Sequence, residues 1–570
     1  MKLLVFVRVF WVLLFVLLFE SIAAQQFVKS EKPDPKFAKL CMHFHNYYDA
    51  LNEYDRLRKS DPDNLLYRYN SGICHLMLNK DKSKAIPEFL WVIEQEKHDD
   101  QVWYYLGQAY LVTGDYDKAI EAFTKFQSLV EEDKNRIPAS RMIEMCNNAK
   151  KAISHPVSTE ITNLGKHINT KYPEFNPYVP ANETMLIFNA QRKSGYRYED
   201  GYYASDLYIS YFKFGRYRRT KRFSSVINSQ DIEEVVGFTT NAATMFVYTK
   251  EKFNRKENLM ITHKRGKAYR PMKEVVIPGF EKVTKTSASL TPSGRYIYFV
   301  AKTDDGVGGK DIYVSKKLPN GEWAEPKLAD SIINTIYNEE YPYFAPDGKT
   351  FFFASEGHNS MGGYDLFRCT YDEKTGKFTE PQNLGYPINT SMDDMTIALS
   401  ESMRYAYIAS LREGGFGDLD LYRVVLKDVK PLYTVVYGGV FNEDSIRLTK
   451  VIAKTNEHID SLNIPINREY KRLLLVKKDT IAAMDTLAKK IPYEKVAVKI
   501  EVIDKKTNTQ FGHYLVKESS ANYNVILPPG EFKIVFRREG YQDYVMDNVI
   551  VKERDKRNRF MVKHVLLSKE

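Results

Sequence analysis

Residues 292–299 read PSGRYIYF, a tight turn followed by a strand rich in aromatic and β-branched residues. The same layout returns at residues 346–353 (PDGKTFFF) and at residues 401–408 (ESMRYAYI). The copies begin 54 and 55 residues apart. One turn-and-strand unit therefore recurs along the middle of the chain.

A tripeptide related to Asp-Ile-Tyr follows each copy after a Gly-rich loop, and it also occurs earlier. It starts at Asp206, Asp311, Asp365 and Asp420, and residues 258–260 fill the gap, so that the steps are 52 to 55 residues. A period slightly above ~40–50 residues with this strand content is typical of a β-propeller. Five copies predict a five-bladed, WD40-like propeller over residues 157–430.

An Asn-Thr motif indicates how the ring closes. It stands at residues 169–170, 334–335 and 389–390, and Asn169 precedes Asn334 by 165 residues, or three steps of 55. An outer-strand motif therefore precedes the first blade. We expect a strand near residues 160–168 to complete the last blade, which removes exposed sheet edges.

The repeated aspartates raise the question of catalysis. Some five-bladed rings hydrolyse glycosides with paired carboxylates in the central channel. A residue that recurs in every blade is better explained as a hydrogen-bond acceptor that stabilises the blade. An unpaired cluster of Asp, Glu or His in one channel mouth would favour the enzyme, and a ring of repeated, internally bonded aspartates would disfavour it. No Gly-x-Ser-x-Gly or His-Glu-x-x-His motif occurs, so we predict no catalytic, cofactor-binding or metal-binding residues.

Residues 103–126 carry the tetratricopeptide pattern at full spacing. The pattern describes two antiparallel helices that touch at small residues and fill the gaps with large ones. Two weaker copies precede it, so we expect three repeats within residues 30–155, about the minimum for a stable stack. A concave surface for a peptide or partner domain is the expected function, with a structural spacer as the alternative. The residues that define the pattern are Trp103, Gly107, Tyr110 and Ala119.

The chain has 570 residues, of which 43% are hydrophobic and 27% charged, as in globular proteins. The net charge of +10 is mild for this length, so charge alone does not indicate nucleic-acid binding. Residues 1–24 combine a basic start, an apolar core and small residues at the end, which is typical of a secretory signal peptide. We therefore expect a periplasmic protein whose mature chain has no transmembrane segment.

Residues 432–570 resume period-2 strands joined by Pro-Gly turns, as in residues 523–536 (YNVILPPGEFKIVF). This pattern predicts a small antiparallel β-sandwich. A Lys-rich segment near residues 445–493 interrupts it. The predicted fold class is thus multidomain, with helical repeats first and two all-β domains after them.

The order of these motifs resembles that of PorE-like, OmpA-associated envelope proteins of Bacteroidota. The propeller repeats are similar to those of TolB. The motifs at residues 527–530 and 540–541 resemble those of a transthyretin-like, carboxypeptidase-regulatory domain. The resemblance implies a non-catalytic periplasmic scaffold that binds envelope proteins of the outer membrane or the type IX secretion machinery. Such proteins usually continue into an OmpA-type domain, and this chain stops without one, which puts peptidoglycan binding in doubt. A propeller-based glycan-binding protein or glycosidase is the alternative.

Overall fold

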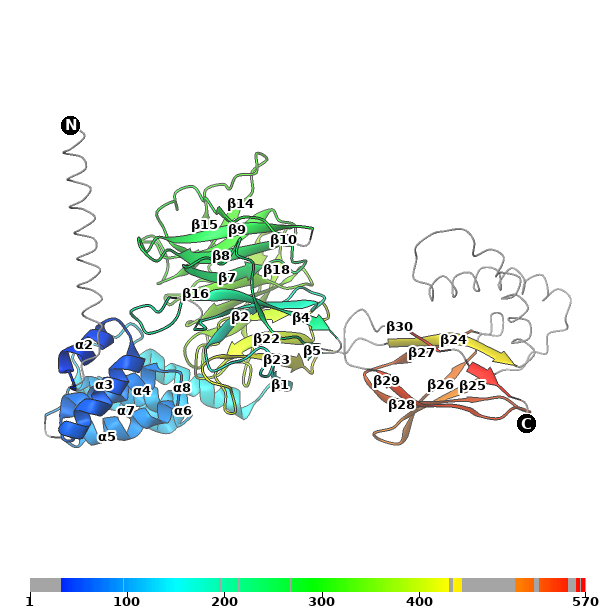
Figure 1. The fold of residues 1–570 in the computed structure, drawn as a ribbon, viewed down its shortest axis with the longest axis horizontal. Helices are drawn as coiled ribbons and strands as arrows, with labels where there is room; N and C mark the ends of the chain where they lie inside the picture. The colour runs from blue at the N-terminus through cyan, green and yellow to red at the C-terminus, as the bar shows by residue number, and fades with distance from the viewer. Residues whose placement is uncertain are drawn as a thin grey trace. The chain divides into compact units, whose positions relative to one another are not determined.

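The computed structural model describes residues 32–95, 97–193, 196–213, 216–266, 268–429, 434–442, 498–516, 522–551, 560–563 and 565–568 (Figure 1). The chain divides into two compact units, Met1–Val429 and Lys430–Glu570. The predicted signal segment and the predicted insertion near residues 445–493 lie outside the described residues. In the described part of the chain, no helix is long and apolar enough to cross a membrane.

Among the described residues, the first unit begins with seven α-helices in antiparallel succession, in the part of the chain where the repeats were predicted. They are α2 (Pro35–His43), α3 (Tyr47–Ser60), α4 (Leu65–Met77), α5 (Ala85–Ile93), α6 (Gln101–Thr113), α7 (Tyr116–Leu129) and α8 (Ala139–Ser154), with a short 3-10 turn at Lys82–Lys84. Asn46 and Asn64 cap α3 and α4, because each side chain accepts a backbone N–H of the first turn.

Small residues let neighbouring helices approach. A Cβ atom at Gly107 of α6 would lie 2.7 Å from the ring of Phe123 in α7, and one at Gly72 of α4 would lie 2.5 Å from the ring of Phe89 in α5. Real Cβ atoms do not come this close to a ring. The same close packing therefore recurs in two successive helix pairs, as the repeat pattern predicts.

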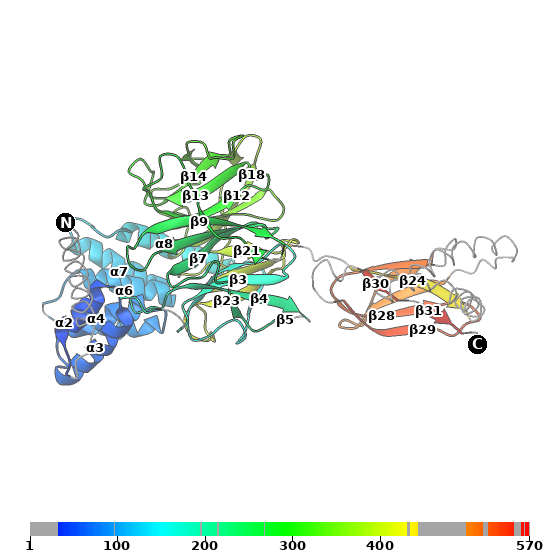
Figure 2. The same ribbon diagram turned by 45° about the horizontal axis from the view of Figure 1, so that its top comes forward.

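Five antiparallel sheets follow in the first unit, in a β-propeller-like arrangement (Figures 1 and 2). The first sheet holds β2 (Glu174–Tyr178), β3 (Met185–Ala190), β4 (Asp206–Lys213), β5 (Arg216–Tyr217) and β6 (Lys221–Arg222). The second holds β7 (Ile232–Phe238), β8 (Thr244–Lys250), β9 (Glu257–Arg265), β10 (Ala268–Tyr269) and β11 (Lys273–Glu274). The third holds β12 (Lys285–Leu290), β13 (Tyr296–Ala301), β14 (Asp311–Lys316) and β15 (Lys327–Leu328).

The fourth sheet holds β16 (Glu339–Phe344), β17 (Thr350–Ser355), β18 (Asp365–Asp372), β19 (Lys377–Phe378) and β20 (Gln382–Asn383). The fifth holds β21 (Ile397–Leu399), β22 (Tyr405–Ser410), β23 (Asp420–Leu426) and the early strand β1 (Thr159–Asn163). β1 pairs with β23 from Thr159 opposite Leu426 to Asn163 opposite Tyr422. This is the closing contact that the Asn-Thr spacing predicts. The first strands of neighbouring sheets also meet one another, as β12 meets β16 and β2 meets β7.

The second unit contains two further sheets. One holds β24 (Thr434–Asn442), β27 (Asn522–Leu527), β30 (Phe560–Val562) and β31 (Val565–Leu567), and the other holds β25 (Lys499–Asp504), β26 (Thr509–Leu515), β28 (Gly530–Arg537) and β29 (Tyr544–Val551). A single hydrophobic cluster draws side chains from both sheets, including Val436 and Val525 of the first sheet and Ile500 and Phe536 of the second.

Candidate functional site

The repeated aspartates each hold a loop in front of the third strand of a sheet. Asp311 Oδ2 accepts hydrogen bonds from the backbone N–H groups of Val307 (2.9 Å) and Gly308 (3.3 Å). Asp365 Oδ2 accepts a hydrogen bond from Met361 N (3.0 Å) and another from an asparagine side chain. Asp420 Oδ2 likewise accepts a hydrogen bond from Phe416 N (2.7 Å) and another from an asparagine side chain. Burial raises the pKa of all three carboxyls.

Asp206 departs from this pattern. Its carboxylate forms a two-point ion pair with Arg222, at 2.6 and 2.8 Å. The predicted set of four therefore contains three loop-binding aspartates and one that binds a neighbouring strand. A purely stabilising role for them stays a prediction.

A second repeated set of carboxylates was not predicted. Each member accepts a backbone N–H and a hydroxyl hydrogen bond from the Thr or Ser four residues before it. Examples are Glu339 with Thr335 (2.9 and 2.7 Å) and Glu174 with Thr170 (2.8 and 2.7 Å). The members are Glu174, Glu233, Glu339 and Asp394. The spacing Asn-Thr/Ser-x-x-x-Glu/Asp in the sequence is the signal that could have found them.

The position after this repeated carboxylate does not repeat. Five side chains directly follow the repeated carboxylate or the residue that stands in its place, and only two of them are acidic. They are Phe175, Glu234, Thr286, Glu340 and Met395. Glu234 and Glu340 are therefore individual features of two blades, unlike the residues that precede them.

Glu340 is almost completely buried, with 3% of its surface exposed. It forms an ion pair with Lys310, and its Oε2 accepts hydrogen bonds from Thr286 Oγ1 (2.9 Å) and Ser287 Oγ (3.2 Å). The ion pair requires the carboxylate form of Glu340. A charge this deep is tolerated because it is paired and hydrogen-bonded on both oxygens.

Glu234 lies in a different environment. Burial raises the pKa of Glu234 to about 7, against the smaller lowering effects of a hydrogen bond with Ser205 and the charge of Lys250. Glu234 and Glu340 also share neighbours, since the charges of both add to the effect of burial in raising the pKa of Tyr248 and of Tyr341. The two carboxyl groups thus belong to one cluster, in which burial raises the pKa of Glu234 and Lys310 pairs with Glu340.

Tyr341 is held in this cluster by an unusual backbone. Its φ is 50°, in the left-handed region that bulky residues rarely adopt, and Asn176 at the matching bulge of β2 has a φ of 48°. Such conformations cost about 1–3 kcal/mol each and cluster at functional sites. We call Glu234, Tyr248, Lys310, Glu340 and Tyr341 the first-strand cluster, because three of them lie on the first strands of their sheets.

The helical part of the first unit reaches the same region through one buried carboxylate. Glu356 accepts two hydrogen bonds from Arg136, from Nη1 (2.6 Å) and Nη2 (2.7 Å), and one from Asn338 Nδ2 (2.6 Å). Arg141 of α8 donates to the Glu356 backbone oxygen at 2.8 Å and lies over the Tyr337 ring at 4.9 Å. The helices are therefore fixed to the loop between β17 and β18.

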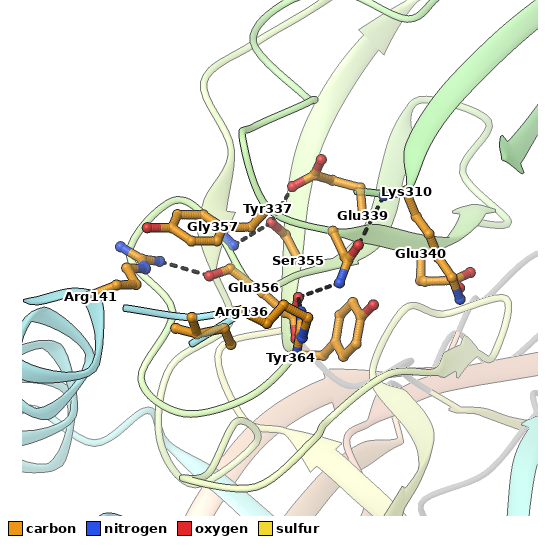
Figure 3. A network of polar contacts seen from close by, with 12 residues as sticks. Arg136, Arg141, Lys310, Tyr337, Glu339, Glu340, Ser355, Glu356, Gly357 and Tyr364 are labelled. Carbon is orange, nitrogen blue, oxygen red and sulfur yellow. Dashed lines mark hydrogen bonds and ion pairs between the residues drawn. The ribbon is translucent and has the colours of Figure 1, made fainter. Parts of the chain in front are cut away.

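Tyr364 lies between this contact and the first-strand cluster. Figure 3 shows Tyr364 beside the ion pair of Arg136 and Glu356, with Glu340 and Lys310 on its other side. After burial, the charges of Glu340 and Glu356 are the main causes that raise the pKa of Tyr364. The helices thus border the cluster of carboxylates and tyrosines.

The residues of the tetratricopeptide pattern build the helical core. Ala119 is fully buried, Gly107 faces Phe123, and Trp103 and Tyr110 pack beside the buried side chains of the last helices. The cysteines of the helical part, Cys41, Cys74 and Cys146, are buried free thiols.

Comparisons with known proteins agree with this architecture. A tetratricopeptide repeat family model matches residues 100–133, and no curated protein matches the chain. Similar solved structures include hydrazine synthase of Kuenenia stuttgartiensis, with 13% identity and a TM-score of 0.25. The match covers 43% of this chain and 58% of that chain. The β-xylosidase/α-arabinofuranosidase CoXyl43 from a compost microbial metagenome is 12% identical, with a TM-score of 0.32, and 46% of this chain covers 93% of it. Trypanosoma rangeli sialidase is 7% identical, with a TM-score of 0.28, and 69% of this chain covers 91% of it.

The prediction of a non-catalytic scaffold is corrected at this point. Five of the similar structures carry glycosyl hydrolase, xylosidase, GH43 or sialidase names in their titles, at TM-scores of 0.28 to 0.32, and the alternative that the sequence left open is taken up below as a proposal. The likeness itself concerns the fold. Glu234 and Glu340 are two unrepeated carboxyls that share neighbours, but Glu340 is paired with Lys310, so they are not the unpaired cluster that was named as the sign of an enzyme. The repeated tripeptide pointed to its aspartates. It could not point to Glu234 or Glu340, because these two residues do not repeat.

Proposed function

We propose that the propeller-like region binds a glycan over the first-strand cluster and hydrolyses a glycosidic bond there. The observation that carries this proposal is the pair Glu234 and Glu340, the two carboxyls that break the repeat at the same strand position. Glycoside hydrolysis requires one carboxylic acid and one carboxylate on either side of the scissile bond. Environments that push two pKa values apart assign these roles.

The surroundings of the pair divide the roles. Glu234, with a pKa raised to about 7, keeps a proton in a large fraction of molecules at neutral pH, as a general acid must. Glu340, paired with Lys310, supplies the carboxylate. Tyr248 and Tyr341 add rings for the apolar face of a sugar and hydroxyls for its edge. Apolar walls with a few placed polar groups are typical of small-molecule sites.

Two variants with different expected phenotypes test the proposal. The full-length chain is assayed against neutral oligosaccharides and against aryl glycosides with good leaving groups. Glu340→Gln should lower kcat/KM on both classes by about 10²–10⁴-fold. Glu234→Gln should do so only on the oligosaccharides, because an aryloxide leaves without protonation.

Glu174→Gln provides the matched control. It changes a repeated carboxylate that binds its own loop, so it should lower the melting temperature more than the turnover. A folded wild-type chain that neither hydrolyses nor binds any of these glycans would refute the proposal. Turnover that survives both Glu234→Gln and Glu340→Gln would refute it equally.

The finer architecture is also a proposal. We infer that the five sheets form a five-bladed ring over residues 157–430 and that the sheets of the second unit form a transthyretin-like sandwich within residues 432–570. The 52–55-residue period and the β1–β23 pairing support the ring, and the shared hydrophobic cluster supports the sandwich.

Tetratricopeptide repeats indicate protein–protein interaction, and the model has no transmembrane helix among its described residues. We propose, from the resemblance to PorE-like envelope proteins, that the repeats over residues 30–155 bind other envelope proteins in the periplasm, to which residues 1–24 would direct the chain. Cell fractionation with crosslinking tests this proposal. Recovery of the chain in the cytoplasm would refute it.

A further inference from the structure

A cavity of about 210 Å³ opens where the first and second sheets meet. Its lining includes Tyr196 from the loop between β3 and β4, Lys252 from the loop after β8, and Asp231 just before β7. Ser229, Asp206 and Arg222 complete its polar wall. The volume is below the ~300–1,000 Å³ of sites for drug-sized ligands, so the cavity is suited to a single small ring.

The cavity lies at the same end of the strands as the first-strand cluster. Asp231 is three residues before Glu234 on one strand. Lys252 follows β8, the strand in which Tyr248 pairs with Glu234. Asp231 and Lys252 of the cavity are therefore close along the chain to Glu234 and Tyr248 of the first-strand cluster.

The ring of Tyr196 and the ammonium group of Lys252 line the cavity, and the ring of Phe253 lies beside Lys252. Lys252 Nζ lies 3.9 Å from the centre of the Tyr196 ring and 4.9 Å from that of Phe253. Tyr196 is 44% and Phe253 79% exposed, an unusual exposure for side chains of this size. In the described part of the chain, no carboxylate forms an ion pair with Lys252. Its donors are therefore available to a ligand.

The two carboxylates of the cavity, Asp206 and Asp231, differ in their partners. Asp206 is neutralised by the two-point ion pair with Arg222. Asp231 accepts the backbone N–H of Lys252 through Oδ1 at 2.9 Å, and no described residue donates to its Oδ2. One cation and one anion remain available on the same wall. Because the charges of Lys252, Arg222, Asp206 and Asp231 cancel, the cavity favours a ligand without net charge.

We propose that this cavity is a second sugar subsite that binds one neutral pyranose or furanose unit of the glycan. Neighbouring hydroxyls of such a unit both donate and accept hydrogen bonds. One hydroxyl donates to Asp231 Oδ2, and the next accepts from Lys252 Nζ. The apolar face of the ring packs against Tyr196 or Phe253. This subsite rests on the proposed function, and it defines the substrate as a neutral oligosaccharide longer than the unit cleaved at Glu234 and Glu340.

Chain length separates the subsite from the first-strand cluster in a binding experiment. Affinities are measured by calorimetry on the full-length chain carrying Glu340→Gln, which prevents turnover. The probes are xylotetraose, cellotetraose and arabinotetraose, the matching disaccharides, and trigalacturonate as a charged probe. Lys252→Met and Asp231→Asn should each weaken the best tetrasaccharide about tenfold and leave its disaccharide unchanged. Lys302→Met, at an exposed lysine in the corresponding loop of the third sheet, should change neither.

The outcomes distinguish this inference from the function on which it rests. Tetrasaccharide binding that is weakened by Glu234→Gln but not by Lys252→Met or Asp231→Asn overturns the subsite alone. Tighter binding of trigalacturonate than of every neutral probe also overturns it, because the ligand would then be acidic. If no probe binds and none is hydrolysed, the proposed function fails first. Unchanged melting temperatures in the variants confirm that an affinity loss is local.

Discussion

Glu356→Gln should weaken the docking of the helices on the β-rich part of the first unit while both remain folded. Glu356 is 2% exposed and accepts three hydrogen bonds, two of them from the Arg136 guanidinium. Glutamine keeps one acceptor and turns an NH₂ group toward Arg136 or Asn338, so at least one donor loses its partner. Hydrogen bonds to charged groups contribute ~1.5–3 kcal/mol each. Arg136 is 65% exposed, and solvent screening reduces its share.

We therefore expect the substitution to reduce the free energy of docking between helices and sheets by about 2–3 kcal/mol. A second transition should appear in chemical denaturation, because the helices then unfold separately from the sheets. Helical circular dichroism reports the first event, and fluorescence of Trp323 in a chain with Trp11, Trp91 and Trp103 replaced by Phe reports the second. Proteolysis in residues 130–138 should accelerate in parallel.

Glu132→Gln is the matched control. Glu132 lies in the same connection between α7 and α8, and its ion pair with Lys134, at 3.5 Å, is largely exposed. We expect less than about 0.5 kcal/mol there. A single transition in Glu356→Gln, within that margin of the wild type, would show that the buried contact does not hold the helices in place.

Three further outcomes follow from the same structure. Gly107→Leu should destabilise the helices by ~1–3 kcal/mol or more, because even a Cβ would lie 2.7 Å from Phe123; unchanged helicity in a thermal melt would contradict the repeat register. Alanine at Asp311, Asp365 or Asp420 should each lower the melting temperature by a similar amount, corresponding to ~1–3 kcal/mol of unpaired donors, and loss of turnover from only one of them without a change in its melt would contradict the stabilising role. Burial raises the pKa of Glu234, Glu339 and Asp394 to about 7, so the folded state holds more protons than the unfolded state between the ordinary pKa values of these groups and pH 7. The free energy of unfolding should therefore fall as pH rises through that window, and Glu339→Gln should make this fall smaller. A denaturation midpoint that does not change from pH 4.5 to 7.5 would contradict the prediction.

The sequence predicted those features whose partners are fixed by a repeat. Gly107 and Phe123 meet because their spacing belongs to one helix pair, and β1 pairs with β23 because the Asn-Thr spacing counts whole repeats. Glu340 was not predicted, because its partners Thr286 and Lys310 come from the preceding sheet and carry no periodic signal.

The contact between helices and sheets was likewise out of reach. Arg136 and Glu356 are 220 residues apart, and neither residue occupies a repeated position. The spacing of the two kinds of repeat placed a domain boundary between residues 155 and 157. They could not reveal that α8 packs against a loop two hundred residues later. Pairing between unique residues is decided by the folded geometry alone.

The pairing of β1 with β23 has a consequence for biogenesis. The strand that closes the last sheet is the first of the β-rich region to be synthesised, and its partner is among the last. At ~5–20 residues per second, the intervening chain takes on the order of tens of seconds to appear. During that interval β1 presents an unpaired edge, the kind of surface on which chains associate wrongly. Truncation before Asp420 should therefore produce aggregation rather than a smaller stable ring.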